Sequence, residues 1–237
     1  MNQAPFTIVG TNQSPINIYR ADIFQVDDEL NVGPYDEKST WGCIKKHGDH
    51  YMFELAEPPK GERAPVVSFR STIAELKSIH FHAPSEHQVE KHEFCAEFHL
   101  VHEICSQGAP GDKYGQEPSS KIVIGVFANA VDDKDALQSL SLEFCNSLST
   151  VKNSEEDCCV SAPFSFNELL KDAYSKLQRF YHYRGSLTTG THDEVVSWFV
   201  LKELISISSS MQDKIRLLDQ PTRELQAMNR RIVLSKD

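Results

Sequence analysis

The sequence predicts a β-dominated α+β protein made of a single domain, residues 1–237. Short β-branched or aromatic runs recur between turn-forming residues through the first two-thirds of the chain. Apolar residues make up 40% of the sequence, which is enough to build a core. The sequence contains no internal repeat and no break in composition, and a length of 237 residues suits one large domain.

Six segments have the composition of strands. Turn-forming residues, among them Pro58-Pro59, Gly61 and Pro84, separate them. The stretch from Ser106 to Ser120 is polar and rich in Gly and Pro, which predicts a surface loop. The predicted strands are residues 15–19, 50–55, 65–69, 79–82, 94–102 and 122–128.

Three segments favour helices. Residues 132–145 carry apolar side chains at helical spacing behind an acidic first residue. Ser165 followed by Glu168 forms a capping-box pattern. The segment 208–217 follows a serine cluster and ends in Lys214 and Arg216, which favour a helix C-terminus.

The charge balance excludes several classes of partner. Lys and Arg total 24 against 34 Asp and Glu, a net charge of -10, which repels phosphate backbones and argues against nucleic-acid binding. No apolar run approaches the roughly 20 residues of a membrane helix, so no membrane partner is expected. The first residues have neither a basic nor an apolar segment of a signal peptide, which favours a cytoplasmic location.

The six cysteines leave two interpretations open. None of their spacings is a C-x-x-C pair, and a chain of this size does not need disulfides to fold. Free thiols in a reducing compartment are the favoured interpretation. A secreted protein with one or two disulfides is the alternative.

Histidine is concentrated in one region. In the predicted strand at 79–82, His80 and His82 point to one face, about 7 Å apart, while Ile79 and Phe81 point to the other. In the next strand His99 shares a face with Glu97, and the segment between the strands suits a turn that makes them antiparallel. Three imidazoles with a fourth position left open are typical of catalytic zinc.

Two neighbours of these histidines suit a supporting role. A carboxylate such as Glu97 on the same strand face needs a hydrogen bond to be buried, and the ring N–H of a metal-bound His99 would supply it. Ser78 stands in the equivalent position before His80 and could support that ring more weakly. For His87, His92 and His102 we expect exposed or structural positions.

Five motifs, in order along nearly the whole chain, resemble the α-class carbonic anhydrase family. They are Gln13-Ser-Pro-Ile-Asn-Ile18, the segment from His80-Phe-His82 through Ser85-Glu-His87, Ala96-Glu-Phe-His-Leu-Val-His102, Gly185-Ser-Leu-Thr-Thr189 with Glu194 and Trp198, and Arg223 with Gln226, Asn229 and Arg231. The resemblance implies a large twisted, mostly antiparallel central sheet with a few short peripheral helices. It also implies Zn²⁺ held by His80, His82 and His99.

The family pattern assigns further roles. Thr188 would accept a hydrogen bond from a zinc-bound hydroxide and donate its own proton to Glu86, and Glu97 would support His99. The CO₂ pocket would be formed by Val101, Val123, Leu187, Thr188, Thr189, Val196 and Trp198. The implied reaction is the reversible hydration of CO₂ to bicarbonate and a proton, with inhibition by sulfonamides or anions.

The sequence departs from the family pattern at three places. The usual proton-shuttle position falls on Asp49, whose pKa is too low, so His50 and His47 become the shuttle candidates. Gly190-Thr191 replaces the usual pair of prolines. His192 stands where many secreted members have a cysteine, which adds to the expectation of an intracellular chain.

Two alternative functions remain. A zinc-hydroxide esterase-type hydrolase would use the same metal on another small electrophile, and Gly190-Thr191 is its support. A non-catalytic carbonic-anhydrase-like binding module is the other alternative, although all three metal ligands are present. The oligomeric state does not follow from the sequence.

Overall fold

The computed structural model describes residues 10–32, 40–47, 50–58, 64–106, 119–132, 160–164, 177–218 and 221–237. Strands dominate these residues, with one α-helix and one short 3-10 helix among them. Their bounds are β1 Asn17–Ile18, η1 Arg20–Asp22, β2 Ile23–Gln25, β3 Leu30–Val32, β4 Thr40–His47, β5 His50–Leu55, β6 Val66–Phe69, β7 Thr72–His82, β8 Gln88–Val89, β9 Ala96–Ser106, β10 Lys121–Val131, β11 Val160–Phe164, β12 Phe180–Gly185, β13 Val196–Leu201, β14 Ile205–Ser208, α3 Ser209–Leu217 and β15 Val233–Lys236.

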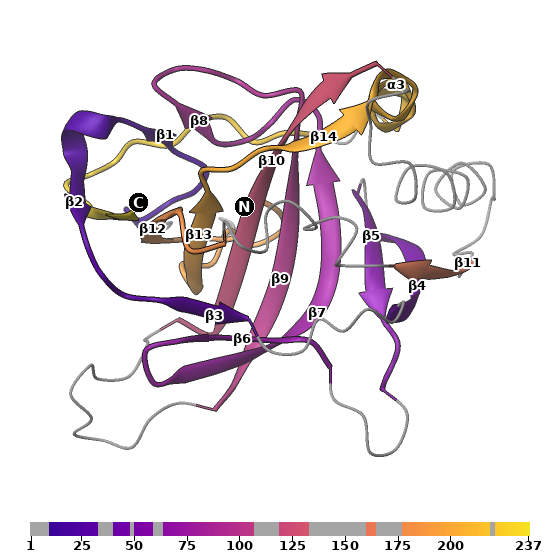
Figure 1. The fold of residues 1–237 in the computed structure, drawn as a ribbon, viewed down its shortest axis with the longest axis horizontal. Helices are drawn as coiled ribbons and strands as arrows, with labels where there is room; N and C mark the ends of the chain where they lie inside the picture. Colours follow the sequence, from indigo (N-terminus) through magenta and orange to yellow (C-terminus); the bar gives the residue numbers. More distant parts are fainter. Residues whose placement is uncertain are drawn as a thin grey trace, which may run out of the picture.

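A large twisted sheet of 13 strands organises the molecule (Figure 1). Its main path runs β11-β4-β5-β7-β9-β10-β13-β12-β15-β2, while β14 joins β10, and β3 and β6 extend from β7. Most neighbours are antiparallel, and the parallel pairs in this sheet are β10 with β13, β10 with β14, and β15 with β2. The predicted fold class is therefore confirmed.

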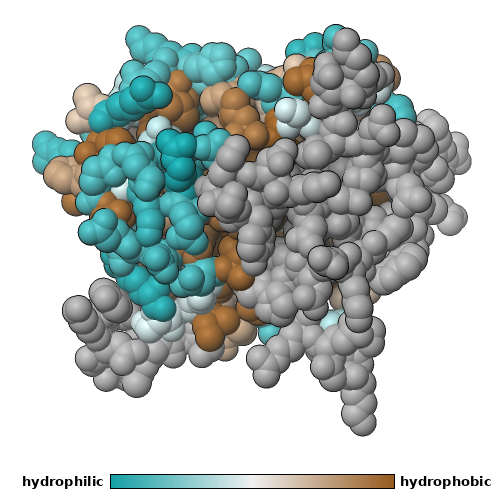
Figure 2. Space-filling model, in the orientation of Figure 1, coloured by the Kyte–Doolittle hydropathy of each residue, from teal (hydrophilic) through white to brown (hydrophobic). Residues whose placement is uncertain are grey.

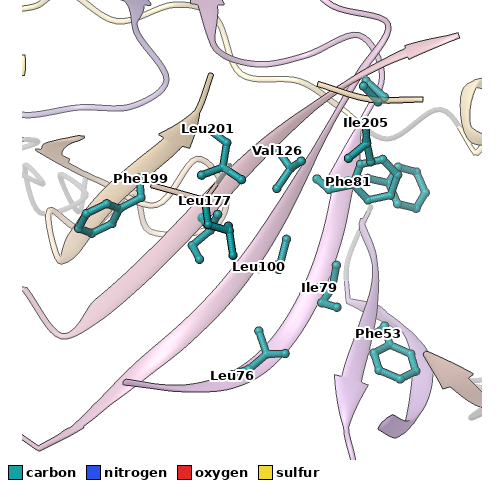
Figure 3. Close-up of a cluster of buried hydrophobic side chains, with 14 of the residues drawn as sticks. Phe53, Leu76, Ile79, Phe81, Leu100, Val126, Leu177, Phe199, Leu201 and Ile205 are labelled. Carbon is teal, nitrogen blue, oxygen red and sulfur yellow. The ribbon is translucent and has the colours of Figure 1, made fainter. Parts of the chain in front are cut away.

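Side-chain alternation along the central strands divides the apolar residues between two faces. Ile79 and Phe81 of β7 and Phe98 and Leu100 of β9 join the larger cluster on one face. Figure 3 labels Ile79, Phe81 and Leu100 in this cluster. A second cluster, which includes Val123 and Trp198, forms separately from it. Because side chains alternate, His80, His82 and His99 point away from the larger cluster.

The predicted strands match the structure in position but not always in length. Residues 50–55 form β5 as predicted, whereas the predicted strand 79–82 is the last part of the much longer β7. The last third of the chain also contributes β12, β13, β14 and β15, none of which is among the predicted strands. Every residue of β13 is buried, so the strand lacks the alternation of apolar and polar residues on which the prediction of strands depends.

Of the predicted helices, the structure confirms the last. Helix α3 begins after Ser208, whose side chain accepts a hydrogen bond from the Met211 backbone N–H. The predicted helices at 132–145 and around Ser165 lie outside the described residues, as does most of the loop predicted at 106–120. No described helix has the length and apolar character that spanning a membrane requires.

The expectation of free thiols is wrong at Cys43, which forms a disulfide. Its partner lies outside the described residues, while Cys95 and Cys105 are free. Cys43 lies on β4, between β11 and β5 in the sheet. Its cross-strand neighbour in β11 is Ser161. Since disulfides are uncommon in reducing compartments, Cys43 gives no support to the cytoplasmic location, which stays a prediction.

The molecule presents a mixed surface. Figure 2 shows hydrophilic residues over much of the described surface on the left of the view, with smaller hydrophobic areas between them.

Candidate metal centre

Strands β7 and β9 bring three imidazoles together. The antiparallel register places His80 directly opposite His99, and His82 opposite Glu97. The Nδ1 atom of His99 lies 3.1 Å from the Nε2 atom of His80. One nitrogen from each of the three rings lies within 4.8 Å of the others, as the alternation of side chains predicted.

Burial keeps two of these rings neutral. It lowers the pKa of His80 and His82 well below the usual value, and the neighbouring histidines lower it further. A neutral imidazole keeps one ring nitrogen with a lone pair, which is the form that binds a metal.

Backbone and side-chain contacts fix which nitrogen faces the cluster. The Nδ1 atom of His82 lies 3.2 Å from the Pro221 carbonyl oxygen, which leaves Nε2 for the cluster. Within the described part of the chain, the Nδ1 atom of His80 has no hydrogen-bond partner, so the weaker support expected from Ser78 is not formed. Ser78 lies on the same strand two residues before His80 and opposite Glu54 of β5.

Glu97 is fully buried and is surrounded by N–H donors. Its Oε2 atom accepts the backbone N–H groups of Glu86 (3.0 Å) and His87 (2.8 Å). Its Oε1 atom lies 2.7 Å from His87 Nδ1 and 3.0 Å from His99 Nε2. Burial alone would raise the pKa of Glu97, but the two histidines hold the pKa well below its usual range, so the carboxylate is ionised.

The ionised carboxylate acts on His99 in turn. Burial alone would lower the pKa of His99, but Glu97 outweighs burial and raises it. The contact with Glu97 also leaves Nδ1 as the atom of His99 that faces His80. This is the arrangement predicted for a ligand and the carboxylate that orients it.

Glu86 and Thr188 lie next to the imidazoles. The Thr188 hydroxyl donates a hydrogen bond to the Glu86 carboxylate, and the backbone N–H of Arg223 donates another at 2.9 Å. The remaining Glu86 oxygen, Oε2, lies 3.4 Å from His82 Nε2 without forming a hydrogen bond. Burial raises the pKa of Glu86, although both hydrogen bonds act against this.

The residues expected to form an apolar pocket gather beside His99. Cross-strand pairing aligns Val123 of β10 with Val101 on one side and Trp198 on the other. The Trp198 ring lies 4.9 Å from the His99 ring, measured between centroids. Val196 belongs to the same cluster and Leu187 packs against it, while Thr189 follows Thr188 in the loop and is half-buried.

The two shuttle candidates differ in what the structure describes. The ring of His50 lies 5.7 Å from the ring of His82, which places His50 beside the three imidazoles. His47 pairs with His50 across the β4–β5 hairpin, but its side chain lies outside the described residues, as does Asp49.

His87 is more important to the site than the sequence suggested. We expected it in the turn, yet it is fully buried and links Glu97 to the Tyr183 hydroxyl, 2.6 Å from its Nε2 atom. Tyr183 donates to the Ser14 hydroxyl at 2.8 Å. The only signal in the sequence was its place in the family motif Ser85-Glu-His87, because a turn position gives no strand alternation to interpret.

Two buried atoms test whether a metal fits here. Among the residues that the structure describes, His82 Nε2 and Glu86 Oε2 both lack a hydrogen-bond partner, although an unpaired buried polar atom costs about 1–3 kcal/mol. A cation bound by the three ring nitrogens would give His82 Nε2 a partner and would attract the Glu86 carboxylate. Three imidazoles that leave a position open are the donor set of catalytic zinc, so the residues fit Zn²⁺.

Comparison with protein families gives a match over almost the full chain. The model of the eukaryotic-type carbonic anhydrase matches residues 2–236. Alpha carbonic anhydrase 8 of Arabidopsis thaliana is 27% identical over 230 residues, which cover 95% of this chain and 53% of the relative. The carbonic anhydrase of Neisseria gonorrhoeae is also 27% identical, over 95% of this chain and 77% of its own. The chain thus spans about half the length of the plant relative.

Solved structures show the same fold. The α-carbonic anhydrase of Photobacterium profundum has a TM-score of 0.70 at 22% identity and covers 95% of this chain and 89% of its own. The enzyme of Thermovibrio ammonificans, in complex with the inhibitor sulfanilamide, has a TM-score of 0.71 at 26% identity, over 96% of this chain and 88% of its own. Dioscorin complexed with ascorbate has a TM-score of 0.74 at 21% identity, over 96% of this chain and 87% of its own.

Proposed function

Because the chain belongs to the eukaryotic-type carbonic anhydrase family, we propose that it is a zinc enzyme that interconverts CO₂ and bicarbonate. The observation that carries this proposal is the convergence of His80, His82 and His99, with one nitrogen of each ring within 4.8 Å of the others. Zinc bound by these three imidazoles would lower the pKa of water to about 7 and so would supply a nucleophile at neutral pH.

Glu97 and the Pro221 carbonyl group prepare the donor atoms. The contact of Glu97 with His99 Nε2 turns Nδ1 toward the metal position, and the Pro221 carbonyl does the same for His82 Nε2. These contacts fix the ring orientations before a metal arrives, which reduces the cost of ordering the ligands.

Thr188 and Glu86 are proposed to orient the nucleophile. Since the Thr188 hydroxyl group donates a hydrogen bond to the Glu86 carboxylate, the Thr188 oxygen is left as an acceptor. Thr188 Oγ1 would then accept a hydrogen bond from the nucleophile, which would leave a lone pair of the nucleophile free to attack. The backbone N–H of Arg223 keeps Glu86 in the position to accept from Thr188.

The apolar residues beside His99 are the proposed resting place of CO₂. Val123 and Trp198 are buried, and Val101 and Leu187 pack against them. A nonpolar gas gains from such a surface, whereas charged bicarbonate does not, so the product is released. His50, and His47 beside it, are the proposed groups that carry the proton to buffer. Sulfonamide inhibition is expected because the Thermovibrio ammonificans relative is solved with sulfanilamide.

Replacing one ligand tests the assignment. We expect His99→Ala to lose bound zinc and CO₂ hydration together, because two imidazoles hold zinc poorly in competition with water. Metal content after dialysis and stopped-flow hydration measure the two effects. His92→Ala, an exposed histidine on the same segment, is the matched control and should keep both. Full zinc occupancy in His99→Ala would show that the ligand set is wrong.

The same measurements separate the alternatives. Stoichiometric zinc without CO₂ hydration in the unmodified protein would favour a zinc-dependent esterase or a non-catalytic binding module over the proposed reaction. Hydrolysis of 4-nitrophenyl acetate that sulfanilamide blocks would then support the esterase.

A further inference from the structure

A pocket of about 490 Å³ lies apart from the metal centre and shares no lining residue with it. Its lining residues come mainly from η1, β2, β8, β10 and β12, from the last residue of β13, and from residue 237. In Figure 1, β2, β8, β12 and the C-terminus gather on the left, which is the side where this pocket lies. Its volume is within the range of small-molecule binding sites.

Aromatic rings line the interior of this pocket. Phe94 and Phe127 stack on each other with their centroids 4.1 Å apart and their planes at 21°. Tyr181 is nearly buried and adds a third ring. Flat apolar walls of this kind favour a planar ring as the bound group, because stacking adds to the gain from burying apolar area.

The charges around these rings have the opposite sign to those of the whole chain. Among the lining residues, Arg20, Arg179 and Lys202 are cations, and Asp237 is the single carboxylate. In the full sequence, acidic residues outnumber Lys and Arg by 34 to 24. The pocket lining therefore has more cations than carboxylates, in contrast to the chain as a whole.

The three cations are not equally available. Lys202 pairs with Asp237 and lies 4.9 Å from the centroid of the Tyr181 ring, and Arg179 pairs with Glu203. Within the part of the chain that the structure describes, the Arg20 guanidinium takes part in no ion pair. Arg20 is thus the cation that can meet a ligand without first giving up a carboxylate.

We propose that this pocket binds an aromatic monocarboxylate, with its ring against Phe94 and Tyr181 and its carboxylate on Arg20. A guanidinium presents two parallel N–H donors that match one carboxylate. A ligand with several negative charges fits less well, because Asp237 and Glu203 lie beside the other two cations and would repel it. This proposal does not depend on the reaction at the metal centre.

Calorimetric titration with naphthalene-2-carboxylate tests the proposal. Saturating benzenesulfonamide is added first, so that a carboxylate at the metal centre does not contribute, and the titration is repeated without it. We expect binding in both titrations. Arg20→Gln should weaken it about tenfold, as for the loss of one charge-assisted contact. Leu204→Glu, at an exposed position of the pocket lining, should weaken it similarly by adding a negative charge.

Two controls make the test specific. Arg216→Gln removes an exposed arginine of α3 outside the pocket and should leave the dissociation constant unchanged. The neutral naphthalene-2-methanol should bind at least tenfold more weakly than the carboxylate. The proposal is wrong if the carboxylate does not bind, if benzenesulfonamide abolishes its binding, if Arg20→Gln and Leu204→Glu bind it normally, or if the alcohol binds equally well.

Discussion

At the scale of single residues, the buried charge of Glu97 is the feature on which the metal centre depends. A carboxylate with no exposure is unstable unless donors surround it, and here two backbone N–H groups and two imidazoles do so. The cost of burying this charge is offset by donors that also hold His87 and His99 in place. The site is therefore organised by the protein itself before any metal binds.

Removing the charge of Glu97 should weaken metal binding. Glu97→Gln replaces one acceptor oxygen by an NH₂ group that faces other donors, so we expect zinc affinity to fall by about 10–100-fold. Competition with a chromogenic chelator measures the change. Glu103→Gln is the control on the same strand, where the exposed carboxylate pairs with Lys121. Equal zinc affinity in Glu97→Gln and the unmodified protein would contradict the role of Glu97.

Another buried histidine, His182, lies far from the metal ligands in the sequence and links stability to pH. His182 stacks on Phe199, and its Nδ1 atom lies 2.9 Å from the Trp198 carbonyl oxygen. Burial lowers the pKa of His182 to about 4. In the unfolded chain the pKa is about 6.5, so between these values the unfolded state binds the extra proton. The free energy of unfolding should therefore fall as pH drops from about 6.5 to about 4, by up to about 3 kcal/mol.

His182→Gln should remove this part of the pH dependence. We expect the variant to be less stable than the unmodified protein at pH 7, because the stacked ring is lost, and the difference to shrink toward pH 4. Urea unfolding at several pH values measures it, and His92→Gln serves as the exposed control. A stability difference that stays constant across this range would show that His182 is not the group that titrates.

At the scale of elements, the pairing of β9 with β10 leaves room for the carboxylate at the site. Gly125 of β10 lies opposite His99, and a Cβ atom added there would lie 2.8 Å from Glu97 Oε1. Glycine is unfavourable in the middle of a strand. Gly125 is explained because the Glu97 carboxylate occupies the space that a side chain at this position would fill.

Filling this space should disturb the site more than the fold. We expect Gly125→Ala to push Glu97 out of place and lower zinc affinity about tenfold, while the circular dichroism spectrum stays unchanged. Ala130→Ser, on the same strand and partly exposed, is the control. Unaltered zinc affinity in Gly125→Ala would mean that Glu97 tolerates displacement.

The sequence predicted those parts of the site that depend on alternation along a strand. The shared strand face of His80, His82, His99 and Glu97 followed from the alternation of side chains and one turn, and the register of β7 with β9 places these residues opposite one another. The burial of His87 was not predictable in this way, because its contacts with Glu97 and Tyr183 join elements far apart in the sequence.

At the scale of the whole molecule, the order of strands in the sheet decides which distant residues meet. Strands β9, β10 and β13 are neighbours, so Val101, Val123 and Trp198 form one surface although they come from three parts of the chain. Nothing in the local sequence fixes a parallel pair such as β10 with β13. Only the resemblance to a known family indicated that these residues would share a pocket.

The central claim is that three histidines of this fold hold a zinc ion that hydrates CO₂. Stopped-flow CO₂ hydration of the purified protein, with its zinc content determined, tests it most directly when it is measured before and after removal of zinc with dipicolinate. We predict fast hydration in proportion to zinc, its loss with the chelator, and its return when Zn²⁺ is restored. Fully zinc-loaded protein that hydrates CO₂ no faster than the buffer would contradict the claim.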